Sequence, residues 1–132
     1  MQTITLKTLK ATLYINAMSS AAIGLLLAAA SGPIASLMGG FNPAIAFWVG
    51  VALIPFAAGV AWVARALPSA RFWVKEIMLA DIAWVAATPI VLVVFSNQLS
   101  VLGQLLIAGV GLVVAGFATI EWLGTRQKMQ AA

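Results

Sequence analysis

The chain has 132 residues, of which 64% are hydrophobic and only 8% are charged. A soluble domain carries about 25% charged residues because its surface contacts water. This composition therefore excludes a soluble globular protein and predicts a surface that contacts lipid. At about 20 residues per membrane span, the length accommodates four helices with short connections. We expect a single all-α domain over residues 1–132, a four-transmembrane-helix bundle.

The net charge and the missing residue types exclude several function classes. The net charge is +4, but the basic residues are scattered at predicted helix ends, so we expect lipid head groups rather than nucleic acid as their partners. Cysteine and histidine are absent, which excludes disulfides, histidine-ligated haem and ordinary zinc or copper sites. Without a nucleophile–base pair or a phosphate-binding loop, we expect no cofactor, no metal and no enzymatic activity.

The first predicted span covers residues 9–30. Its basic start and Ala28-Ala29-Ala30 also fit a secretory signal with a small-residue cleavage site. Against that alternative, the apolar stretch is long, and Asn16, Ser19 and Ser20 interrupt it. We therefore expect a retained helix.

A short interfacial helix is predicted in the first loop, where Pro33 can open the helix and Gly39 can end it. The other predicted spans cover residues 44–64, 73–95 and 99–123. Turn-forming segments separate them, at 39–43, 67–69 and 96–98. Ser100 is a candidate N-cap for the fourth span.

The basic residues predict the orientation of the spans. All seven fall before the first span, between the second and third, or after the fourth: Lys7, Lys10, Arg65, Arg71, Lys75, Arg126 and Lys128. The other two loops carry no charge. By the positive-inside rule, both termini are cytoplasmic, and we expect a multi-pass protein of the bacterial inner membrane.

The two halves of the chain can be aligned as a weak parallel repeat of two helices each, although short apolar segments also match by chance. The segment 50–54 aligns with 109–113, and Trp62 and Trp122 have nearly the same offset. Asn16 and Asp81 occupy similar depths in the partner spans. Such a repeat would be related by an axis along the membrane normal.

Polar residues inside the spans carry most of the functional information, because a central Asp costs about 2.5–3.5 kcal/mol to insert. Asp81 lies about eight residues into the third span, roughly 12 Å below the interface. Asn16 has a comparable depth, whereas Glu121 is expected about one turn from the cytoplasmic end, paired with Arg65 or Arg126. The strong polar groups therefore all belong to the cytoplasmic half.

Two faces of the predicted helices are suited to meet at this level. Asn16 and Ser20 share one face of the first span, and Asp81 and Trp84 lie on one face of the third. If the faces meet, Asn16 donates to Asp81, and Arg65 can reach Asp81 or Glu121. The cluster is then either a clamp that fixes helix register or a cytoplasm-facing site. The candidate residues for both interpretations are the same: Asn16, Ser20, Trp62, Arg65, Asp81, Trp84 and Glu121.

The second half resembles a group of uncharacterised small four-span bacterial inner-membrane proteins. The resemblance depends on Asp81-Ile82-Ala83-Trp84, on the segment 99–103, and on Phe117-Ala118 leading to the segment 121–126. It covers roughly the last 55 residues. Those proteins often have Asn in place of Asp81 and Gln in place of Glu121, which would argue against proton transfer by these acids if the Asn and Gln forms are equally competent. The resemblance implies no known activity.

Two functions fit these observations. The first is a non-enzymatic protein that acts through helix–helix association, as a homo-oligomer or an accessory subunit of a membrane complex; the stripe Ala108, Gly111, Ala115 and Ala118 is suited to close helix contact. The second is a small transporter or a bundle that binds a small molecule or lipid in the cytoplasmic half.

Overall fold

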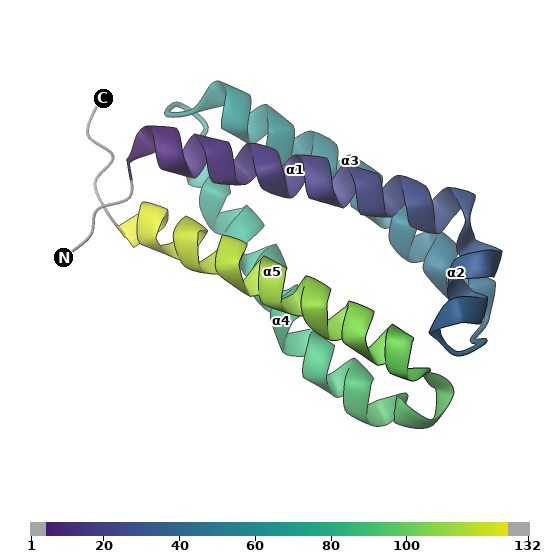
Figure 1. Ribbon diagram of the computed structural model, residues 1–132. Coiled ribbons are helices and arrows are strands. Elements are labelled where there is room, and N and C mark those ends of the chain that lie inside the picture. The colour runs from purple at the N-terminus through teal and green to yellow at the C-terminus, as the bar shows by residue number, and fades with distance from the viewer. Residues whose placement is uncertain (1–4, 127–132) are drawn as a thin grey trace.

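The computed structural model describes residues 5–126 and is all-α, as the sequence predicts (Figure 1). No strand occurs among the described residues. The elements in chain order are α1 (Leu6–Ala29), α2 (Ser31–Met38), α3 (Pro43–Ala66), α4 (Phe72–Val94), the 3-10 turn η1 (Ser96–Gln98) and α5 (Val101–Arg126). Lys128, one of the seven basic residues that predict the orientation, lies outside the described residues.

Four of these helices are long and apolar enough to cross a membrane, namely α1, α3, α4 and α5. The shortest, α4, has 23 residues, which at about 1.5 Å per residue exceeds the roughly 30 Å of a hydrocarbon core. The protein is therefore a multi-pass membrane protein. The helices extend beyond the predicted spans at several ends, and α5 continues to Arg126 rather than ending at residue 123.

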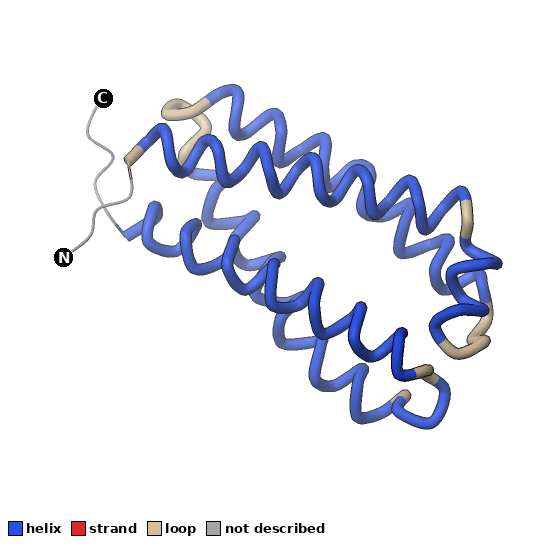
Figure 2. The backbone as a smooth tube through the Cα atoms, viewed as in Figure 1, coloured by secondary structure: helices blue, strands red, loops and turns tan. Residues whose placement is uncertain are grey.

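The long helices form two antiparallel pairs, α1 with α3 and α4 with α5 (Figures 1 and 2). The start of α1, the end of α5 and the α3–α4 connection lie at one end of the bundle, which we call the terminal end. Helix α2 lies at the opposite end, the α2 end. The two pairs contact each other mainly through α1 and α5, while α3 and α4 hardly touch.

Close approach of backbones holds each pair together. A Cβ atom at Gly50 would lie 2.5 Å from the Gly24 carbonyl oxygen and 2.7 Å from the Ala28 nitrogen, so α1 and α3 cross where neither glycine has a side chain. In the other pair, a Cβ atom at Gly111 would lie 2.9 Å from the Thr88 side chain. Small residues in membrane helices permit this packing.

The apolar core belongs to the terminal end. It is built from Leu9, Leu13, Ala17, Val60, Val63, Ala64, Leu67, Ala70, Val74 and Ile77. Many large apolar side chains elsewhere are exposed, among them Leu25, Trp48 and Val93. In a soluble protein these would face water, but on a membrane-spanning bundle they contact lipid tails.

Helix α2 joins the two pairs at the α2 end. Gly39 ends α2 with a φ of 138°, as the sequence predicts, and a side chain there would strike the Gln98 carbonyl. Ser100 caps α5 by accepting a hydrogen bond from the Gly103 N–H (3.0 Å), which confirms the predicted cap. Its hydroxyl also donates to the Leu37 carbonyl (2.8 Å). The predicted short helix therefore contacts both helix pairs.

Candidate functional site

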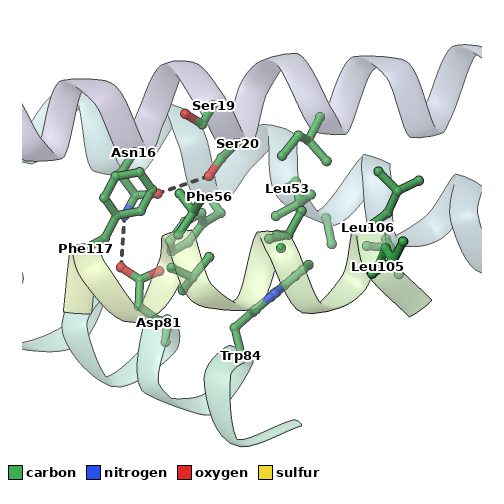
Figure 3. A pocket seen from close by; sticks show the side chains of 18 residues that line it. Asn16, Ser19, Ser20, Leu53, Phe56, Asp81, Trp84, Leu105, Leu106 and Phe117 are labelled. Atoms are coloured by element: carbon green, nitrogen blue, oxygen red, sulfur yellow. Dashed lines mark hydrogen bonds between the residues drawn. The ribbon is translucent and has the colours of Figure 1, made fainter. Parts of the chain in front are cut away.

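Asn16 lies at the centre of a polar cluster formed by α1, α4 and α5. Its side-chain nitrogen donates to Asp81 Oδ2 (2.9 Å) and to Glu121 Oε2 (3.1 Å). Its side-chain oxygen accepts from the Ser20 hydroxyl (3.2 Å). Figure 3 shows the bonds to Asp81 and Ser20 at one end of a cavity. The predicted bond from Asn16 to Asp81 is present, and Glu121 joins it from α5.

Helical spacing explains why these polar side chains point inward. On α1, Asn16 continues the buried row that starts with Leu9 and Leu13, and on α4, Asp81 follows Val74 and Met78. Residues three, four and seven apart share one helix face. The polar residues therefore occupy positions that would otherwise carry core side chains.

The cluster is buried from solvent and is poor in hydrogen-bond donors. Glu121 is 0% exposed, Asn16 2% and Asp81 4%. Both hydrogens of the Asn16 amide face carboxyl groups, and the Ser20 hydroxyl is already used. Glu121 Oε1 has no partner among the described residues. Because an orphaned buried acceptor costs about 1–3 kcal/mol, this oxygen requires explanation.

No basic side chain of the described residues neutralises the two carboxyl groups. The expectation that Glu121 pairs with Arg65 near the head groups is wrong: Glu121 is fully buried and bonds Asn16, and Arg65 is exposed. Arg65 forms no ion pair with Asp81 either. The side chain of Arg126, the other expected partner of Glu121, lies outside the described part of the chain.

A cavity of about 790 Å³ begins at the cluster and lies between the two helix pairs. Asn16, Ser19, Ser20 and Asp81 supply its polar end, and Trp84 lines it from α4 (Figure 3). The remaining lining residues are small or apolar: Ile23, Val49, Ala52, Leu53, Phe56, Ala80, Leu105, Leu106, Gly109, Val110, Val113, Val114 and Phe117. The arrangement is a polar end joined to an apolar body, within the size range of small-molecule sites.

The structure separates Trp62 and Arg65 from the other candidate residues. Trp62 is 56% exposed and lines a second, shallower hollow of about 380 Å³ between α3 and α4, together with Trp73 and Glu76. Sequence reasoning grouped it with the cluster because it shares the cytoplasmic half. Depth along the membrane normal does not determine which way a side chain points.

The apolar lining of the cavity was not predicted. Phe56 and Phe117 flank the polar end, and Leu105 and Leu106 lie at the far end (Figure 3). In the sequence these residues look the same as those that face lipid. Only the Gly109 position carries a signal, because a glycine in the middle of an apolar helix often marks close approach or open space.

Comparisons with protein-family models, curated proteins and solved structures find no match to this chain.

Proposed function

We propose that this protein is a small intramembrane binding bundle whose cavity takes an amphipathic small molecule, as a step in moving or sensing it across the membrane. The cavity carries the proposal. Its polar end is lined by the Asp81 carboxyl group together with Asn16, Ser19 and Ser20, and its walls are apolar. Asn16 connects this end to the second carboxyl group, that of Glu121, which is fully buried and does not line the cavity. An amphipathic ligand satisfies both parts, since its head group would supply polar partners and its tail would replace lipid or empty volume.

Helix–helix association, the other function considered, has less support. Part of its stripe is used inside the bundle, because Gly111 packs on Thr88 and Ala118 is buried. At Gly111 the small residue is therefore explained by the contact between α4 and α5.

We further propose that the termini are cytoplasmic and that the membrane is the bacterial inner membrane. Both ends of the described chain lie at the terminal end (Figure 1), which also holds the basic residues of α1 and of the α3–α4 connection. The positive-inside rule assigns such an end to the cytoplasm. The cluster would then lie at the cytoplasmic end of the cavity, and the apolar body would extend from it toward the α2 end (Figure 3).

A cavity-filling variant tests the binding proposal. Gly109 lines the cavity, and a Cβ atom there meets no atom within 4 Å, so Gly109→Leu projects into open space without a clash. Gly116→Leu is the matched control, since residue 116 lies on the same helix, is equally open and does not line the cavity.

The probe is 4-phenylbutan-1-ol, a neutral amphipathic molecule, titrated calorimetrically into the protein in lipid nanodiscs against empty nanodiscs. We expect saturable binding to the wild type and to Gly116→Leu, and its loss in Gly109→Leu with the helical circular dichroism spectrum unchanged. Equal heats for all three proteins, or none beyond empty nanodiscs, would refute the proposal.

A further inference from the structure

We infer that the head group of the ligand is a primary ammonium, so that the cavity is selective for amphipathic amines. This inference rests on the proposed binding function and names its ligand class. It comes from the balance of donors and acceptors around Asn16 together with the charge of the surrounding helices.

The cluster offers more acceptors than donors. Of the two carboxyl groups, only that of Asp81 lines the cavity, where its Oδ2 accepts from the Asn16 nitrogen and no hydrogen bond is described for its Oδ1. Ser20 donates to Asn16 Oδ1 and adds nothing to the carboxyl groups. A ligand at this end therefore meets an acceptor on Asp81, and an ammonium group brings three donors.

The charge around the site favours the same ligand. The basic residues Arg65 and Lys75 are exposed, and neither is described in an ion pair with Asp81 or Glu121. An amine that enters the cavity can take the proton of the Asp81 carboxyl group and bind it as an ammonium–carboxylate pair, an interaction that the low-dielectric surroundings strengthen. An anionic head group would add a third acidic group to an acceptor-rich site and is excluded on the same ground.

The rest of the cavity defines the remainder of the ligand. Beyond Asp81, the walls are formed by aliphatic and aromatic side chains such as Leu53, Phe56 and Trp84. Trp84 lines the cavity further along α4, and its ring points away from the Asp81 carboxyl group toward the apolar body (Figure 3). The geometry thus combines a cation-binding end with an apolar tail site.

Two probes of the same shape test the head group. 4-Phenylbutylamine and 4-phenylbutan-1-ol differ only in the terminal group, ammonium or hydroxyl. Both are titrated into nanodiscs, and the signal that Gly109→Leu removes is taken as cavity binding. We expect the amine to bind about tenfold or more tightly than the alcohol, because hydrogen bonds to charged groups are the stronger ones.

The variant Asp81→Asn/Glu121→Gln keeps the size of both side chains and removes their acidity. In that variant the ratio of the amine affinity to the alcohol affinity should fall to about one, because the acidity that distinguishes the two head groups is gone. If the alcohol binds the wild type as tightly as the amine does, the amine inference fails and the binding function survives. If the double variant keeps the preference, the carboxyl groups are not its source and the inference also fails. If neither probe gives a cavity signal, the proposed function itself fails.

Discussion

Replacing Asn16 by Leu, a side chain of similar size, should weaken the association of the two helix pairs. Asn16 is 2% exposed and provides the described hydrogen bonds to Asp81 and Glu121. Hydrogen bonds between membrane helices average about 0.6 kcal/mol each and reach about 1.7. Two such bonds, lost beneath two carboxyl groups that stay buried, give a decrease of about 1–3 kcal/mol in the free energy of unfolding.

The companion variant is the triple replacement Asn16→Leu, Asp81→Leu and Glu121→Met. It removes the donors and the acceptors together, so no buried polar group is left without a partner. Replacing a buried polar or ionic cluster by apolar side chains of similar volume is often neutral or stabilising. We expect the free energy of unfolding of the triple variant to lie within about 1 kcal/mol of the wild-type value or above it. We also expect this variant to lose ligand binding.

Reversible unfolding in mixed micelles, with increasing sodium dodecyl sulfate and tryptophan fluorescence as the signal, measures both variants. Ser20→Ala serves as the control, because it removes one partly buried bond to Asn16 and leaves the carboxyl groups bonded. If Asn16→Leu is as stable as the wild type, the hydrogen bonds from Asn16 to the two carboxyl groups do not contribute to stability. A triple variant less stable than the single one would show that the cluster is a stabilising clamp.

Three further results are expected. Gly50→Ala should destabilise the protein by about 1–3 kcal/mol in the same assay, because its Cβ would meet backbone atoms of α1. Gly59→Ala is the control, since a Cβ atom there meets nothing within 4 Å. Equal effects of the two substitutions would contradict the close crossing of α1 and α3 at Gly50. Ser100→Ala should cost about 1 kcal/mol through the lost cap and the lost bond to α2, and an unchanged unfolding midpoint would contradict this. Because the chain has no cysteine, Ser69→Cys and Asn97→Cys report orientation: in intact cells a membrane-impermeant maleimide should label residue 97 and not residue 69, and the reverse pattern would invert the topology.

The helices were predictable, and their ends to within three residues, because they depend on local signals. A long apolar run gives a membrane helix whatever its neighbours are, and the start of α5 at Val101 follows from the hydroxyl of Ser100. The short helix α2 was predicted in the same way, from Pro33 and Gly39. The bond between Asn16 and Asp81 was predicted too, because two polar side chains at one membrane depth have few other partners.

The partner of Glu121 was predicted wrongly for a physical reason. The error concerns its partner rather than its depth, since Glu121 lies five residues before the end of α5 at Arg126, close to the predicted distance of about one turn. The rotation of α5 then places Glu121 on the face that carries Gly111 and Ala118. Rotation about a helix axis depends on packing with neighbours, which an evenly apolar sequence does not reveal.

The packing pattern connects stability with the cavity. Within each pair the helices approach closely. Backbone atoms meet at Gly24 and Gly50, and the Thr88 side chain packs on Gly111. Between the pairs, contact is concentrated at the two ends: at α2, and at the terminal end where the core and the Asn16 cluster lie. The cavity fills the interval between these contacts. A substitution of Asn16 therefore weakens the association between the two helix pairs. It should not change the stability of either pair once the two pairs have separated.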